Sequence, residues 1–112
     1  MATRYFNTTL GLSMLPDGDF TVTTVSMDEA VDYLRRDGVE NVANPSHGNT
    51  LQAITQKLGV DVRMAAVGRR VILNQGDACL VAQIGNIPRE TREFTDEEIQ
   101  AANFEFRLVE VK

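Results

Sequence analysis

Hydrophobic and polar residues alternate along several short segments of the chain, and this alternation predicts β-strands. Residues 19–25 (DFTVTTV) and 104–111 (FEFRLVEV) place apolar or β-branched residues at every second position. Residues 78–84 (ACLVAQI) are apolar almost throughout, which is typical of a central strand that is covered on both faces. Shorter strands are expected at 4–9, 39–43, 60–64 and 69–73. A sheet is therefore expected to carry much of the core.

Three segments carry the signals of α-helices. Two of them open on a capping box, in which Ser or Thr is followed three residues later by Glu; these are Ser26 with Glu29 and Thr95 with Glu98. The first box predicts a helix that runs to about Asp37 and ends at Gly38. The remaining helix is expected to begin in the polar segment 44–50 and to end at Gly59, with apolar residues at helical spacing between them. Loops are expected at 10–18 and a turn at 74–77.

This mixture of strands and helices predicts an α/β fold, with a mixed central sheet of about five or six strands flanked by about three helices. The chain has 112 residues, which fits a single domain over residues 1–112. No apolar run is long enough for a membrane span, and the N-terminus has no apolar segment typical of a signal peptide. The only cysteine is Cys79, so no intrachain disulfide can form, which fits a reducing cytosol.

The charge and the metal-ligating residues narrow the function classes. The formal net charge is −5, whereas proteins that bind long nucleic acids usually carry a basic surplus. A small anionic ligand is still allowed, because a pocket needs only a few local donors. A single histidine and a single cysteine argue against a zinc site. We therefore expect no metal, no cofactor, no long nucleic acid and no membrane partner.

The segment 46–50 (SHGNT) is the strongest candidate for chemistry. It places His47 at a predicted helix start, where free N–H groups and a partial positive charge favour phosphate. Gly48 leaves room for a ligand backbone, and Ser46, Asn49 and Thr50 add neutral hydrogen-bonding groups. An imidazole beside a phosphodiester can act as a general acid near neutral pH. The alternative is a simple helix cap with His47 on the surface, and from the residues alone this alternative is favoured.

Weaker candidates lie at two strand ends and in one arginine-containing segment. Gln83 interrupts the apolar strand, and a buried amide needs a partner that a ligand could supply. Glu90, in the following loop, could act as a base or orient another group. Asn7 and Thr8 end the first strand, and Arg63, Arg69 and Arg70 could offer charge to an anion. The alternatives are a solvated loop with Gln83 bonded to backbone, and an exposed strand arginine.

Taken together, the chain resembles the viral ring nucleases, a family of type III anti-CRISPR proteins. Four stretches carry the resemblance over almost the whole chain: FNTT at 6–9 with ML at 14–15, SHGNT at 46–50 with LGV at 58–60, GD at 76–77 leading to VAQ at 81–83, and FTDEEI at 94–99 with FEF at 104–106. No one motif is decisive, but their order and spacing together are fairly specific.

The resemblance implies a homodimer that binds cyclic tetra-adenylate across its two-fold axis and cuts it without a metal. In such a reaction a ribose 2′-OH attacks the adjacent phosphorus, and a histidine protonates the departing 5′ oxygen. By position, His47 takes the acid role and Glu90 a supporting one. The implied ligand contacts are Asn7, Thr8, Gly11, Ser13, Ser46, Gly48, Asn49, Thr50, Arg69, Gln83 and Arg89. The implied location is the cytoplasm of a host cell.

Departures from the family pattern keep a second function open. Gly48 stands where the family has an acidic residue, and Asn49 where it has serine. Two expected arginines are displaced, to Arg69 and Arg89, and arginine is the side chain best suited to phosphate. The chain could therefore be a sponge that sequesters a cyclic nucleotide intact. A third possibility is a structural or interaction protein of a virus with no ligand.

Overall fold

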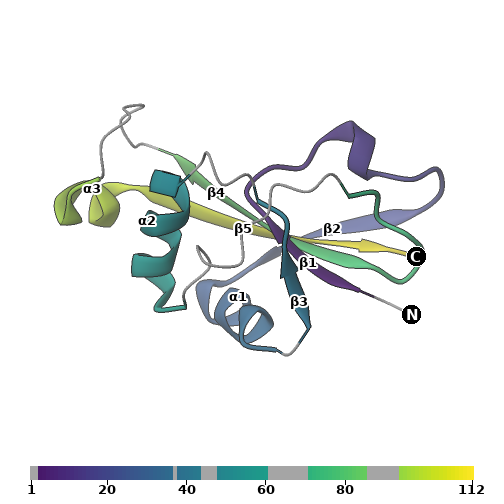
Figure 1. Cartoon of the computed structure of the whole chain (residues 1–112), viewed down its shortest axis with the longest axis horizontal. Coiled ribbons are helices and arrows are strands. Elements are labelled where there is room, and N and C mark those ends of the chain that lie inside the picture. The colour runs from purple at the N-terminus through teal and green to yellow at the C-terminus, as the bar shows by residue number, and fades with distance from the viewer. Residues whose placement is uncertain (1–2, 37, 44–47, 61–70, 86–93) are drawn as a thin grey trace.

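A computed structural model describes residues 3–36, 38–43, 48–60, 71–85 and 94–112 of the chain. Its strands are β1 (Arg4–Asn7), β2 (Phe20–Val25), β3 (Val39–Asn41), β4 (Ala78–Gly85) and β5 (Asn103–Val111). Its helices are the 3₁₀ turn η1 (Leu12–Met14) and the α-helices α1 (Met27–Leu34), α2 (Gly48–Leu58) and α3 (Asp96–Ala101). Figure 1 shows these elements around one sheet. Over the described residues, the predicted α/β fold with a mixed sheet and three α-helices is confirmed.

The sheet has the strand order β2-β5-β4-β1-β3. β4 is the middle strand, as its apolar sequence predicts, and it pairs in parallel with β1 and antiparallel with β5. β3 adds to β1 in parallel, and β2 adds to β5 in the antiparallel sense. Because both faces of β4 are covered, its successive side chains at 79–82 are all buried.

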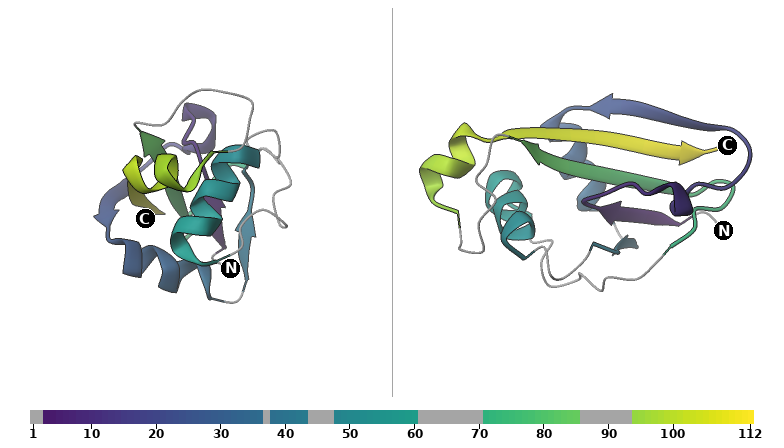
Figure 2. Two further views of the ribbon diagram at one scale, coloured as in Figure 1. Left: turned by 90° about the vertical axis from the view of Figure 1, so that its left-hand side faces the viewer. Right: turned by 90° about the horizontal axis from the view of Figure 1, so that it is seen from above.

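One face of the sheet packs against α1 and α2. The buried residues of this core are Phe6 of β1, Leu80 and Ala82 of β4, Phe106 of β5, Ala30 and Tyr33 of α1, Leu51, Ile54 and Leu58 of α2, and Ala43 after β3. The helices present apolar residues at intervals of three and four, which form a single stripe. Figure 2 shows α2 and α3 at one end of the sheet. A hydrogen bond from Gln56 Nε2 to Asp96 Oδ1 (2.6 Å) links these two helices.

The opposite face, called the open face below, has no α-helix over it within the described residues. Its core contains Tyr5, Met14, Val42, Val71, Leu73, Cys79, Val81, Val109 and Val111. The cover comes from the loop with η1 and from residues 71–73. The strand predicted at 69–73 is wrong over its described part, 71–73, which has no strand pairing. Val71 and Leu73 are buried while Ile72 is exposed, so the apolar alternation reflects the packing of an irregular segment. The Leu73 N–H of this segment donates to the Met14 carbonyl (2.8 Å).

Three elements end earlier than their sequences predict. β1 stops at Asn7 and not at Thr9, because the Asn7 side chain accepts from the next backbone amides and turns the chain. β3 stops at Asn41, whose side chain accepts from Ala43 N–H (2.9 Å). α1 ends at Leu34, so Gly38, with φ of +83°, makes the turn into β3 and does not cap the helix.

The predicted helix starts of α1 and α3 are confirmed by their hydrogen bonds. In α1, Ser26 Oγ accepts from Glu29 N–H and the Glu29 carboxylate accepts from Ser26 N–H, both at 3.1 Å. Thr95 and Glu98 make the same reciprocal pair at α3 (2.8 and 3.2 Å). α2 ends where Gly59 adopts φ of +72° and donates to the Thr55 carbonyl, as predicted. The strands predicted at 60–64 and 69–70 fall almost wholly outside the described residues.

Candidate functional site

Several candidate residues lie at one edge of the sheet because three parallel strands end there. β1, β3 and β4 run in the same direction, so their carboxyl ends share an edge. Asn7 and Thr8 lie where β1 ends, and Gln83 lies in the part of β4 that continues two residues past the partner of Asn7. The chain leaving β3 leads to the start of α2. In open α/β sheets this edge is the usual place for a ligand.

Asn7 and Thr8 are polar but buried, at 9% and 7% exposure. The Asn7 Oδ1 accepts from Thr8 N–H (2.8 Å) and more weakly from Thr9 N–H (3.4 Å). The Asn7 Nδ2 donates to Met14 Sδ (3.7 Å). The amide of Asn7 is therefore engaged within the protein, and its first role is to shape the strand end.

The start of α2 carries further candidate residues. Gly48 and Asn49 belong to the first turn of this helix, and Thr50 is half-buried there. No acidic residue lies in that first turn, so the turn itself carries no side chain that would neutralise the positive end of the helix. α2 packs on the face of the sheet opposite to Gln83.

Gln83 lies on the open face, where it lines a pocket of about 100 Å³. The pocket is lined by Leu10, Val22, Val81, Gln83, Glu105, Arg107 and Val109. Gln83 is exposed, so the sequence-based idea of a buried amide in need of a partner is wrong. Its neighbours Ala82 and Ile84 belong to the helix-covered core, whereas Gln83 projects from the opposite face of β4. The exposure of Gln83 on that face explains why a polar residue interrupts the apolar strand.

Glu105 and Arg107 are site candidates that the sequence analysis missed. They stand two residues apart on β5, opposite Gln83 and Val81 respectively. Cross-strand partners project from the same face, so both reach the pocket. The Arg107 Nη2 lies 3.7 Å from the Glu105 Oε2, and the side chains are 39% and 61% exposed. The sequence shows that these two residues alternate with Phe104 and Phe106. It does not show which face of the sheet lacks a helix.

Gly11 and Ser13 lie away from the edge. Both are exposed in the loop that returns over the open face, with Ser13 inside η1. Figure 1 places η1 toward the end of the sheet where the C-terminus lies, far from α2. Within one chain these two residues therefore lie away from the start of α2, although Met14, next to Ser13, contacts Asn7. Ser46, His47, Arg69, Arg89 and Glu90 lie outside the described residues.

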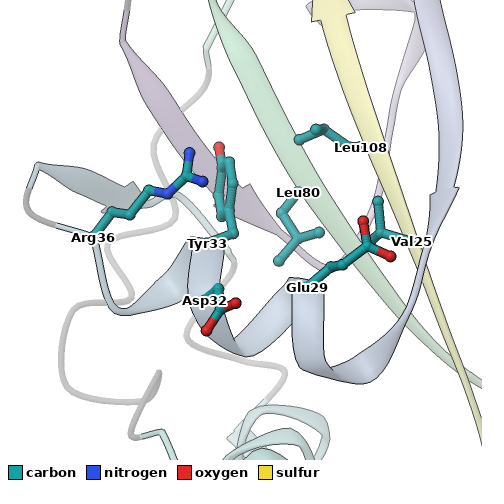
Figure 3. Close-up of a pocket in the computed structure, with 7 residues that line it drawn as sticks. All are labelled: Val25, Glu29, Asp32, Tyr33, Arg36, Leu80 and Leu108. Carbon is teal, nitrogen blue, oxygen red and sulfur yellow. The ribbon is translucent and has the colours of Figure 1, made fainter.

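A second cavity, of about 180 Å³, lies between α1 and the sheet (Figure 3). Its apolar wall is Val25, Leu80 and Leu108, and its rim carries Glu29, Asp32, Tyr33 and Arg36. The Tyr33 hydroxyl donates to the Tyr5 carbonyl (2.8 Å) and lies 3.3 Å from the Ala78 carbonyl, so it joins the parallel strands β1 and β4 to the helix. Figure 3 shows Asp32 turned away from the wall. This cavity is part of the packing of α1.

Two buried groups have shifted pKa values, and neither lies at the edge. Burial raises the pKa of Tyr33 well above its ordinary value, and the nearby Cys79 adds to the increase. Burial likewise raises the pKa of the Cys79 thiol to about 12. Cys79 is thus a protonated core residue and a poor nucleophile. No group of three or more His, Cys, Asp or Glu side chains able to hold a metal occurs among the described residues. Within that same part of the chain, no helix has the length and apolar character to span a bilayer.

Comparisons with known proteins give a family and a fold. A family model described as STIV B116-like matches residues 5–106. Among solved structures, B116 of Sulfolobus turreted icosahedral virus is similar, with a TM-score of 0.75 and 18% sequence identity over 97% of this chain and 99% of that one. A search of the curated proteins found no match.

Proposed function

The chain belongs to the STIV B116-like family, and on that premise we propose that it binds a cyclic oligoadenylate and cleaves it without a metal. The observation that supports the proposal is the parallel pairing of β1 and β4, which brings Asn7–Thr8 and Gln83 to the same end of the sheet. The helix α2, whose start carries residues 48–50, packs on the opposite face. The resemblance to viral ring nucleases includes residues of these three segments among its implied ligand contacts.

In the proposed reaction the substrate provides its own nucleophile. A ribose 2′ oxygen forms a bond to the adjacent phosphorus while the bond from phosphorus to the 5′ oxygen breaks. His47, directly before α2, donates the proton that the 5′ oxygen takes up, and Glu90 accepts the proton lost from the 2′-OH. The products are linear and end in 2′,3′-cyclic phosphates.

The start of α2 suits this chemistry electrostatically. An α-helix of 11 residues with no acidic side chain in its first turn offers free N–H groups and a partial positive charge to a phosphate. This favours the anionic ligand despite the overall negative charge of the chain. A homodimer would present the same groups twice to a two-fold symmetric ring. In a host cytoplasm, such cleavage would lower the signal of a type III CRISPR system.

The direct test is to incubate the purified protein with labelled cyclic tetra-adenylate in the presence of EDTA. Linear fragments with 2′,3′-cyclic phosphate ends are expected. His47→Ala should slow their formation by about 10²–10⁴-fold, because a general acid contributes on that order. The variant should keep its melting temperature and its affinity for the ring. Absence of linear product at stoichiometric protein would refute the enzymatic proposal.

A sponge is the second candidate, and Gly48 and Asn49 beside His47 are the observations that favour it. In that case the protein would bind the ring with an increase in melting temperature. Heat denaturation of the complex would then release intact ring. If neither fragments nor a thermal shift appear with any cyclic nucleotide, both candidates are wrong.

A further inference from the structure

The cavity between α1 and the sheet has an exposed, charged rim, and we propose that it binds an extended segment of a partner protein through one apolar side chain. The segment carries a basic residue on one side of this apolar residue and an acidic residue on the other. The inference goes beyond the proposed function and does not depend on it, because the cavity lies on the helix-covered face and Gln83 projects from the opposite face.

The size of the cavity fits a single side chain. Its volume is about 180 Å³. Pockets that enclose drug-sized molecules have volumes of about 300–1,000 Å³, so a nucleotide is too large for this cavity. An apolar side chain that projects from another protein needs only the space that is present.

The floor of the cavity is apolar and accessible. Leu80 of β4 and Leu108 of β5 are direct cross-strand partners, and Val25 at the end of β2 completes this wall. Leu80 is buried, but Val25 and Leu108 are only half-buried, so part of their apolar surface is left for a ligand. Tyr33 adds its ring, because its hydroxyl already donates to the Tyr5 carbonyl. Removal of this apolar surface from water favours the binding of an apolar side chain.

The rim of the cavity carries opposite charges at its two ends. Glu29 lies in the first turn of α1 and Arg36 directly after its last turn, which places their Cα atoms roughly 10 Å apart. Figure 3 shows the two side chains on opposite sides of Leu80, whereas Asp32 is turned away from the wall. Glu29 Oε1 accepts from Ser26 N–H, and a carboxylate with two oxygens can accept from a cation as well. Within the described residues, no acidic side chain pairs with Arg36.

The separation of these two charges predicts the sequence pattern of the partner segment. Side chains of an extended segment alternate, so the residues two positions before and after the apolar residue project in the same direction as it does. At about 3.3 Å per residue these two flanking residues lie about 13 Å apart, and flexible charged side chains can span the difference. A segment with Lys at the first position, Leu at the third and Glu at the fifth therefore meets Glu29, the cavity and Arg36 together.

The test uses the heptapeptide GKSLSEG, blocked at both ends, and full-length protein with ¹³C-labelled valine and leucine methyl groups. At millimolar concentration the peptide should shift the signals of Val25, Leu80 and Leu108 and leave those of Val22 and Val109 on the open face unchanged. Serine in place of the peptide leucine should weaken binding by about tenfold or more, because the apolar contact is lost. No shift, shifts confined to the open face, or equal affinities of the two peptides would overturn the proposal.

A charge swap tests the contact between Arg36 and the acidic residue of the peptide. Arg36→Glu should weaken binding of GKSLSEG by about threefold and strengthen binding of GKSLSKG by a similar factor, which is the scale of one exposed ion pair. Arg35→Glu makes the same change at the neighbouring exposed residue, which does not line the cavity, and should leave the ratio of the two affinities close to that of the parent protein. Equal effects of the two variants would show a general charge effect and refute the role of Arg36.

A dilution series without peptide tests a different occupant. The Val25 and Leu108 signals should not depend on protein concentration. Shifts of these signals that grow with protein concentration would assign the cavity to a second copy of the chain and overturn the proposal of a separate partner.

Discussion

Replacement of Asn7 by alanine should destabilise the protein even when no ligand is present. The family resemblance implies that Asn7 contacts a ligand, and in the structure its side chain also ends β1. The Oδ1 atom accepts from Thr8 N–H at 2.8 Å and from Thr9 N–H at 3.4 Å, and the residue is 9% exposed. Alanine removes this acceptor at a buried strand end.

The size of the effect follows from the buried donor. Leaving a buried N–H without its acceptor costs about 1–3 kcal/mol. For a chain of 112 residues, an unfolding entropy of about 2.1 cal/mol/K per residue means that each 1 kcal/mol lowers the melting temperature by about 4 °C. The expected decrease for Asn7→Ala is therefore about 4–13 °C.

Thermal unfolding followed by circular dichroism measures this decrease directly. Asn7→Ser should recover part of it, because a serine hydroxyl can accept from the same backbone amides, although more weakly. Ser13→Ala, an exposed change in the same loop, is the control and should stay within about 0.5 kcal/mol of the parent protein. A melting temperature of Asn7→Ala equal to that of Ser13→Ala would refute the structural role of Asn7.

Three further predictions concern the core. Tyr33→Phe removes the 2.8 Å hydrogen bond to the Tyr5 carbonyl and should cost about 1 kcal/mol in urea unfolding; an unchanged midpoint would contradict this. Asp77→Ala removes the acceptors of Thr3 N–H (2.9 Å) and Asn74 N–H (2.8 Å) and should cost about 3 kcal/mol, whereas Ala at the exposed Asp17 should cost under about 0.5 kcal/mol. The folded state keeps the Cys79 proton, since its pKa is about 12 against 9.0 for a free thiol, and the raised pKa of Tyr33 acts in the same sense. The stabilisation from these two protonated groups should therefore be fully present below pH 9. Above pH 9 the free energy of unfolding should fall by at most about 1.4 kcal/mol per pH unit for each group. Cys79→Ala should reduce the decrease that is measured between pH 9 and 10 by urea unfolding.

Local signals in the sequence were sufficient for most of the elements. The two capping boxes fixed the starts of α1 and α3, because the bonds that make a cap lie within four consecutive residues. The apolar run of β4 indicated the central strand, because burial on both faces leaves no position for polar residues until Gln83.

The structure of residues 71–73 depends on contacts distant in sequence. Val71 and Leu73 alternate with an exposed residue as in a strand, but they pack on the open face and bond to Met14 without joining the ladder. Alternation reports which side chains are buried and says nothing about where the backbone hydrogen bonds go.

Most of the helices and strands, the central strand and the candidate residues at 7–8, 48–50 and 83 could therefore be predicted from the sequence. Which of these residues lie at the same end of the sheet depends on how the strands pair. Parallel pairing of β1, β3 and β4 brings their ends to one edge, and antiparallel pairing of β4 with β5 sets Glu105 beside Gln83 across 22 positions of sequence. Strand register is fixed by the burial of whole faces, a property of the assembled sheet that no single segment contains.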